Sequence, residues 1–199
     1  TNNTRGGGIY ITKNSHPQLN NIEIKDNIAN WGGGIYIENS NPSLKNLTVS
    51  ANHASVDGGG LYVREANPIF ARLLIYANNA SDFGGGIFFF KASPELTNIT
   101  IVDNRSDYGA GVSVSADSTP KFINSIFGKN YGDTIYIGHS GNISVSYSNF
   151  DPVSIKMASP LAEVYIGSSG NISVSYSNPM DSFSIEEMYS PYGDDRLIA

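Results

Sequence analysis

The sequence predicts an all-β fold, a right-handed parallel β-helix (solenoid) with coils of about 26 residues. Three observations predict it: a glycine triplet recurs at a nearly constant interval, a proline recurs in step with it, and an asparagine follows each proline at a fixed distance. A segment of this length cannot bury its apolar side chains alone. Successive repeats must therefore stack and join equivalent strands into parallel sheets.

The glycine triplets mark the first strand of each repeat. An apolar, aromatic, apolar run follows each triplet, and in a strand its first and third side chains point inward while the middle one points outward. The triplets begin at Gly6, Gly32, Gly58 and Gly84, with a fifth, Gly-Ala-Gly copy at Gly109. The predicted inward residues are Ile9, Ile35, Leu61, Ile87 and Val112, with Ile11, Ile37, Val63, Phe89 and Val114 beside them.

The prolines mark a second strand, whose pattern is seen in Leu44-x-x-Leu47-x-Val49. We interpret it as a strand with one buried face. The same run also matches a leucine-rich repeat, and 26 residues is within that family's range. A leucine-rich repeat returns through a helix or 3₁₀ segment, whereas this return begins with three glycines and a β-branched run, which oppose a helix. The β-helix is therefore favoured. The prolines are Pro17, Pro42, Pro68, Pro94 and Pro120.

An asparagine stands ten residues after each proline, at Asn27, Asn52, Asn78, Asn104 and Asn130. An unpaired buried amide is costly, so we expect each of these to turn inward at a bend and bond backbone groups or the next asparagine. This predicts a structural ladder. A second run of asparagines predicts a weaker ladder of the same kind. Asn46 and Asn98 of this run stand in N-x-Thr sequons, but inward amides would carry no glycan. Its members are Asn21, Asn46, Asn98 and Asn124, with Arg72 interrupting.

The regular marks predict three parts of the chain. Residues 1–150 form regular coils, residues 151–180 form irregular further coils with an inserted loop around 151–160, and residues 181–199 form a cap, linker or tail. Within the second part, the nonapeptide that begins at Gly141 recurs identically from Gly170, 29 residues later. The chain begins at Thr1 without a signal-like segment, which we interpret as a processed or excerpted fragment of a longer precursor.

Composition excludes several classes of partner and cofactor. The net charge is −6, and its 12 basic residues are interspersed among 18 acidic ones, so no basic stripe is present for nucleic acid. The absence of cysteine excludes disulfides and thiolate metal sites. No apolar run is long enough for a transmembrane segment. His16, His53 and His139 occupy unrelated repeat positions, so no metal site and no cofactor is predicted.

Two short elements carry a family resemblance. Gly33-Gly34-Ile35 and Phe127-Gly128-Lys129-Asn130 resemble the paired GG[A]I and F-x-x-N elements of polymorphic outer-membrane proteins. More broadly, residues 6 to about 150 resemble the glycine-rich right-handed β-helix repeats of secreted bacterial surface proteins and of the pectate-lyase-like superfamily. The resemblance implies the fold. It implies no single activity, because many functions share this scaffold.

An aromatic column is the first candidate binding feature. Its members lie between inward residues, so we expect them to point outward and to stack into a partly apolar strip for sugar rings, another protein or another copy of the chain. The alternative is that the rings only stiffen an exposed strand. The column comprises Tyr10, Tyr36, Tyr62, Phe88, Tyr136 and Tyr165, broken by Ser113.

An acidic edge is the second candidate. Enzymes on pectate-lyase-like scaffolds use clustered carboxylates with Ca²⁺, or paired acids that flank a glycosidic bond. Asp82 is predicted to stack on Asp107, with Asp57 and Asp133 nearby, beside the glycine turns. Aspartate is also an ordinary turn residue, and this reading is favoured.

These observations together predict a non-enzymatic structural or adhesive protein, extracellular or on the cell surface. Its expected partners are further copies of itself, stacked head to tail into a fibre, or surface glycans and proteins. Unpaired strand edges at the ends of a solenoid favour such stacking. Two alternatives remain open: a polysaccharide lyase or hydrolase that acts at the acidic edge, and a glycan-binding module that uses the aromatic column.

Overall fold

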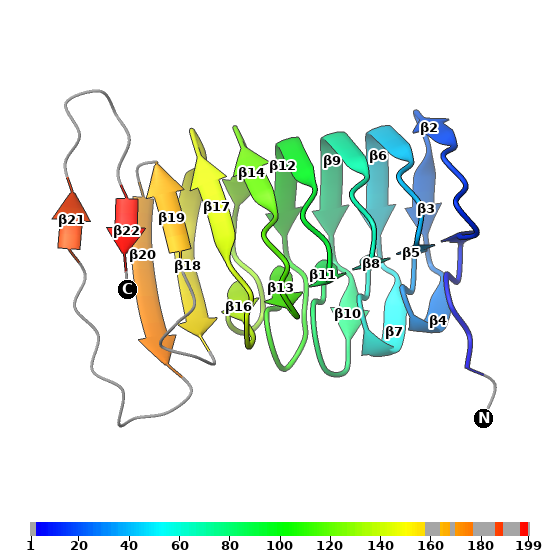
Figure 1. The fold of residues 1–199 in the computed structure, drawn as a ribbon. Coiled ribbons are helices and arrows are strands. Elements are labelled where there is room, and N and C mark those ends of the chain that lie inside the picture. The colour runs from blue at the N-terminus through cyan, green and yellow to red at the C-terminus, as the bar shows by residue number, and fades with distance from the viewer. Residues whose placement is uncertain (1–2, 158–163, 168–169, 177–185, 189–195, 199) are drawn as a thin grey trace.

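The computed structural model is a β-solenoid of parallel strands, with about five turns of about 26 residues each. It describes residues 3–157, 164–167, 170–176, 186–188 and 196–198. The coils stack along one axis, with the N-terminal segment at one end of the stack (Figure 1). The predicted fold class is confirmed.

The strands that follow the glycine triplets form the first wall. They pair in register, so that Ile35 lies between Ile9 and Leu61 and every repeat position becomes a column of side chains about 4.8 Å apart. The strands are β1 (Ile9–Ile11), β5 (Ile35–Glu38), β8 (Leu61–Arg64), β11 (Ile87–Phe90), β13 (Val112–Ser115) and β16 (Ile135–Ile137).

The strands that follow the prolines form the second wall, and the three eight-residue strands among them are bent. In these three, Asn46, Arg72 and Asn98 have φ of +55°, +57° and +58°, so one residue in each is left-handed. The x-x spacing of the apolar pattern therefore marks a corner, and the predicted strand with one buried face is present as one strand that bends there, as in Ser43–Ser50. The strands are β2 (Gln18–Asn20), β3 (Glu23–Lys25), β6 (Ser43–Ser50), β9 (Ile69–Tyr76), β12 (Glu95–Val102), β14 (Lys121–Ile123), β15 (Ile126–Phe127) and β17 (Ile143–Ser146).

A third, shorter sheet comes directly before the triplets. It consists of β4 (Ile28–Trp31), β7 (His53–Asp57) and β10 (Asn79–Ala80), in the order β10-β7-β4. Small residues face inward here, and Ala29, Ala54 and Ala80 are all buried. This sheet leads the chain into the glycine turns.

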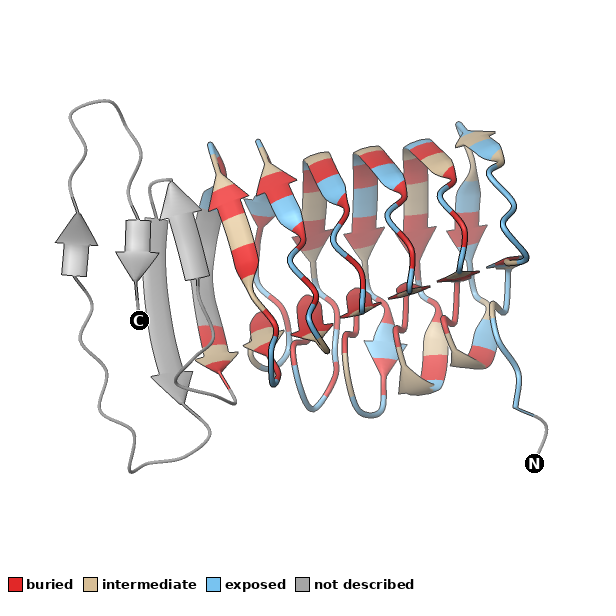
Figure 2. Ribbon diagram, in the orientation of Figure 1, coloured by how far each residue is buried: buried red, intermediate tan, exposed pale blue. Residues whose placement is uncertain are grey.

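The inward columns form one continuous core along the axis, and the buried residues recur at the same place in successive coils (Figure 2). Leu44, Phe70 and Phe122 on the second wall face Ile35, Ile87 and Val112 on the first, and all are at most 1% exposed. Burial stabilises such side chains by about 1.5–3 kcal/mol each, which offsets the entropy of ordering the coil.

The glycine triplets allow this close stacking. The first glycine is left-handed, as at Gly58 with φ of +67°. At the second, a Cβ on Gly59 would lie 2.5 Å from the carbonyl oxygen of Gly85 in the next coil. A side chain there would push neighbouring coils apart.

The asparagines that follow the prolines form a continuous ladder inside the bend. Asn78 is typical: its Nδ2 donates to the Val49 carbonyl at 2.9 Å and to Asn104 Oδ1 at 3.0 Å. Its Oδ1 accepts from the backbone N of Asn52 at 3.0 Å and from Asn52 Nδ2 at 2.9 Å. Each buried amide thus satisfies the next one, at 0–8% exposure for Asn52, Asn78, Asn104 and Asn130.

The second asparagine run is different, and the prediction of inward side chains was wrong. These residues occupy the left-handed corner of the second wall, where asparagine is better tolerated than most residues. Asn98 is exposed, and its Oδ1 accepts from Asn124 Nδ2 on the outside of the coil. Arg72 Nε likewise donates to Asn46 Oδ1.

The last part of the stack departs from the predicted plan. Residues 149–157 form a strand, β18 (Asn149–Met157), where a loop was predicted, and Ile155 pairs with Ile135 of β16. The two identical nonapeptides do not stack on each other. Val145 in the first pairs with Ile166 of β19 (Val164–Gly167), whereas β20 (Gly170–Tyr176) in the second pairs with β18.

Beyond residue 180 the described residues form one small antiparallel pair, β21 (Glu186–Met188) with β22 (Arg196–Ile198). The rest of the predicted cap, linker or tail, residues 181–185, 189–195 and 199, lies outside the described residues.

Candidate functional site

The outward aromatic column forms a second apolar cluster on the outer face of the first wall. Tyr36, Tyr62 and Phe88 point away from the main core but are only 2%, 7% and 5% exposed. Their rings follow one another, with centroids 4.9 Å apart between Tyr36 and Tyr62 and 5.0 Å between Tyr62 and Phe88. The predicted exposed strip is therefore wrong for these three residues.

The cover comes from the residue directly before each glycine triplet. Trp31 and Phe83 pack against the three buried rings, together with Phe90, and we call this set of six residues the outer aromatic cluster. The covering residues form a pre-triplet column: Arg5, Trp31, Asp57, Phe83 and Tyr108. This column was not predicted from the sequence, although its members stand at a constant position, directly before each glycine triplet.

The remaining members of the predicted column are at its ends. Tyr10 is 44% exposed and Tyr136 is half-buried. Tyr165 does not belong to the column, because it pairs with Ser144 on the second wall while Lys156 pairs with Tyr136. The error follows from the shortened coil at β18. The binding role of the column stays a prediction.

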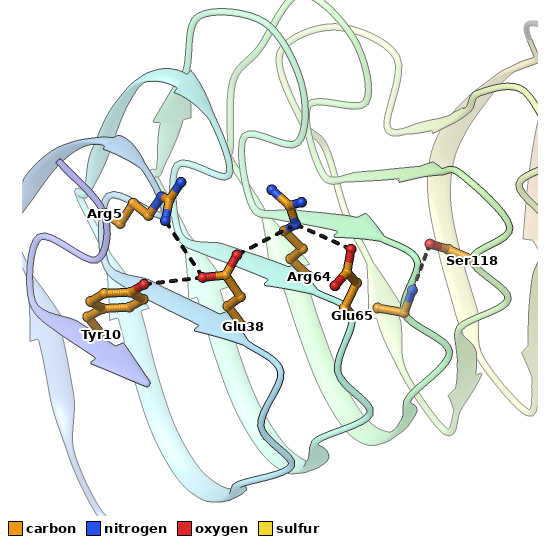
Figure 3. Close-up of polar contacts among 7 residues, drawn as sticks. Arg5, Tyr10, Glu38, Arg64, Glu65 and Ser118 are labelled. Carbon is orange, nitrogen blue, oxygen red and sulfur yellow. Dashed lines mark hydrogen bonds and ion pairs between the residues drawn. The ribbon is translucent and has the colours of Figure 1, made fainter. Parts of the chain in front are cut away.

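A row of charged groups borders the cluster at its N-terminal end, and we call it the charged rim (Figure 3). Glu38 lies 3.6 Å from both Arg5 and Arg64, and its Oε2 accepts from the Tyr10 hydroxyl at 3.2 Å. Arg64 Nε is also 3.6 Å from Glu65, yet this buried atom has no hydrogen bond. The rim alternates in charge along the coil axis.

Cations rest on the rings around the edge of the cluster. Arg5 Cζ lies 6.0 Å from the Trp31 centroid and 5.5 Å from that of Tyr36, and Arg64 Cζ lies 5.5 Å from the Phe90 ring. At the other end Lys156 Nζ lies 5.5 Å from the Tyr108 ring. The electron-rich ring faces thus hold basic side chains at both ends.

Asp57 is the one carboxylate of the pre-triplet column, between Trp31 and Phe83. Burial raises its pKa to about 6, with a smaller contribution in the same direction from the charge of Asp82 and an opposing one from a hydrogen bond that the Phe83 backbone N donates to Oδ1 at 3.2 Å. Burial, with the charges of Tyr36 and Asp57, also raises the pKa of Tyr62.

The stacked coils and the glycine turns agree with the family comparison. The model of the right-handed β-helix region matches residues 7–178. The chain belongs to the right-handed β-helix family. None of the curated proteins and none of the solved structures that were compared matches it.

In this right-handed β-helix, the acidic edge is less concentrated than predicted. Asp82 and Asp107 occupy one exposed column, and Asp82 lies near Asp57. Asp133 Oδ2 lies 3.9 Å from Lys156 Nζ, with which it forms an ion pair. Across the described ranges, no group of three or more His, Asp or Glu side chains is arranged to hold a metal ion.

The predicted unrelated positions of the histidines are seen in the structure. His16 and His139 are exposed, and His16 Nδ1 accepts from the Asn41 backbone N at 2.9 Å. His53 lies on β7 of the third sheet. No helix in the part of the chain that the structure describes is long and apolar enough to cross a bilayer.

Ser113 breaks the aromatic column and changes its packing. Because serine is small, the Phe83 and Tyr136 rings approach to 5.6 Å across it, with Tyr108 5.0 Å from Phe83. The Ser113 hydroxyl is fully buried and has no hydrogen-bond partner. Such a group lowers stability.

Proposed function

We propose that this β-helix is a non-enzymatic structural or adhesive protein of the extracellular space or cell surface, which associates end to end with further copies of itself. The open edge of the first coil carries the proposal. Within the described residues, β1, β2 and β3 pair with the second coil only. An unpaired row of backbone donors and acceptors recruits another strand.

The side chains of this edge favour the same partner. Ile9, Leu19 and Ile22 belong to the inward columns but are only partly buried, because among the described residues a coil covers them on one side only. The columns of Ile9 and Leu19 continue with apolar residues in the later coils, and that of Ile22 continues with Leu47, Leu73 and Ile99. A second copy that stacks in register would continue both the hydrogen-bond ladder and the core.

A pair of charge variants on β2 tests the proposal. Leu19→Lys places an ammonium at the open end of the core, whereas Gln18→Lys places the same charge on the outside of the same strand. We expect the unaltered chain and Gln18→Lys to form concentration-dependent oligomers by analytical ultracentrifugation and stacked fibres in negative-stain images. Leu19→Lys should remain monomeric with an unchanged β-sheet circular dichroism spectrum.

Two results would reject end-to-end association. One is a monomer of the unaltered chain at every concentration, which would leave the edge to another segment of a longer chain. The other is equal assembly of both lysine variants, which would place the contact elsewhere.

The glycan-binding alternative depends on the aromatic rings that are exposed to solvent. Tyr10 and Tyr108 are 44% and 39% exposed, and Tyr108 lies beside the Lys156 ammonium. Aromatic faces next to a cation suit acidic sugars. Loss of glycan retention in Tyr108→Ala, with retention kept in Tyr147→Ala at a distant exposed position, would favour this alternative.

The lyase or hydrolase alternative depends on Asp82 and Asp107. Turnover of an acidic polysaccharide, measured with and without Ca²⁺ and abolished by Asp107→Ala, would replace our proposal with this one.

A further inference from the structure

The pre-triplet column has a gap in its aromatic cover at Asp57. Trp31 and Phe83 belong to the coils on either side, so their backbones are about 10 Å apart, two strand spacings, with only the short aspartate between them. The Tyr62 ring, from the same coil as Asp57, lies in the layer beneath, where it contacts Tyr36 and Phe88. A carboxylate is thus surrounded by aromatic rings on the outer face of the coil.

This carboxylate has no cationic partner among the described residues. The five ion pairs found there involve Glu23, Glu38, Glu65 and Asp133 but not Asp57. Its one side-chain hydrogen bond comes from the backbone N of Phe83. The charged side chain that shifts its pKa is Asp82, which has the same sign. A half-buried anion in this setting attracts a cation from outside.

Other aromatic rings in and beside the cluster are in contact with basic side chains. Basic side chains rest on Trp31 and Tyr36 (Arg5), on Phe90 (Arg64 and Lys91) and on Tyr108 (Lys156). None of these ring contacts is to Tyr62 or Phe83, and although the charges of Arg64 and Arg5 act on Tyr62, neither arginine is among the groups that shift the pKa of Asp57. The chain's own cations lie against rings in and beside the cluster, and none of those in the described residues pairs with the Asp57 carboxylate.

We propose that Asp57, Trp31 and Phe83, above the buried Tyr62 ring, form a subsite for a compact organic ammonium ion. The carboxylate would pair with the positive charge, and the ring faces would contact the alkyl groups, as in aromatic recognition of quaternary ammonium ligands. The same chemistry is offered by a free alkylammonium compound and by a lysine side chain of a partner protein. This subsite does not depend on end-to-end association.

The chain contains a single tryptophan, Trp31, which reports directly on the subsite. Its fluorescence would be titrated with choline, n-butylammonium and 3,3-dimethylbutan-1-ol at constant ionic strength. We expect saturable quenching by the two cations with dissociation constants on the order of millimolar, and none by the alcohol, a neutral isostere of choline. Tighter binding of n-butylammonium indicates a lysine side chain as the natural ligand, and tighter binding of choline indicates a quaternary ammonium.

Two variants separate the subsite from general charge attraction. Asp57→Asn should weaken binding by about tenfold or more, whereas Asp26→Asn, at an exposed corner of the first coil, should leave it unchanged. Binding to the unaltered chain should also weaken as the pH falls below about 6, because Asp57 then becomes neutral.

The proposal is overturned by equal quenching from the neutral alcohol, by equal losses in the two asparagine variants, or by the absence of saturable quenching. Phe83→Ala gives an independent check: it should weaken cation binding while Asp57 is intact, and unchanged binding would remove the rings from the site.

Discussion

The main core and the outer aromatic cluster are built on opposite faces of the same strands, yet they differ in kind. The main core contains mainly aliphatic and phenylalanine side chains, and the polar groups beside it, the asparagine amides and the hydroxyls of Ser125 and Ser148, are hydrogen-bonded. The outer aromatic cluster includes or adjoins Asp57, the Arg64 Nε atom and the Ser113 hydroxyl, each with an incomplete set of partners. The interior is arranged for stability, and the outer face retains unsatisfied polar groups where contacts are made.

Adjacent residues of β11 give the most direct measurement of this difference. Phe89 points into the main core at 0% exposure, and Phe88 points into the outer cluster at 5%. We expect Phe89→Ala to lower the free energy of unfolding by about 4 kcal/mol and Phe88→Ala by about half as much, because the outer site can relax and admit water. Urea unfolding followed by circular dichroism measures both. Equal losses would mean that the outer cluster is a second core.

The asparagine ladder should be the next most sensitive feature. Asn78→Ala removes four hydrogen bonds inside the coil, two accepted by Oδ1 and two donated by Nδ2, so we expect a loss of about 3 kcal/mol. Asn98→Ala, on the exposed run, is the matched control and should cost less than about 1 kcal/mol. A similar loss in both variants would contradict the contrast between a buried ladder and an exposed corner.

The charge of Asp57 gives the outer cluster a pH dependence that the main core lacks. Its folded-state pKa of about 6 exceeds the usual 3.8, so the folded state binds the proton more tightly and stability rises as the pH falls from about 6 to about 4. Asp57→Asn should therefore stabilise the chain at pH 7 by about 1 kcal/mol, after allowance for solvent screening, and have little effect near pH 4. Denaturant unfolding of the unaltered chain and of Asp57→Asn at both pH values tests the sign of this effect. A gain in stability at pH 4 but not at pH 7 would contradict it.

Ser113 should give the smallest effect. Ser113→Ala removes a buried hydroxyl without a partner and leaves the ring contacts of Phe83, Tyr108 and Tyr136 in place. We expect stabilisation by about 0.5 kcal/mol, measured as a raised midpoint of urea unfolding. Destabilisation would show that the hydroxyl contributes a contact to the fold.

The repeat determined most of the fold from the sequence alone. Glycine triplets, prolines and asparagines each require a particular backbone geometry, so their spacing fixed the length of the coil and the identity of the inward columns. The same reasoning failed where the marks end. The coil that ends in β18 is shorter than the others, and no residue pattern indicated that Lys156 would take the position expected for Tyr165.

The sequence by itself determined which residues face the axis, because period-two alternation and in-register stacking are local and repeated. Only the tertiary structure decided what happens on the outer face. Whether Tyr36 is exposed depends on where Trp31 and Phe83 lie, and whether Asp57 has a cation depends on how far Arg5 and Arg64 reach. Both depend on contacts between different segments and neighbouring coils. Such contacts are determined by the size and direction of side chains that come together only in the folded chain.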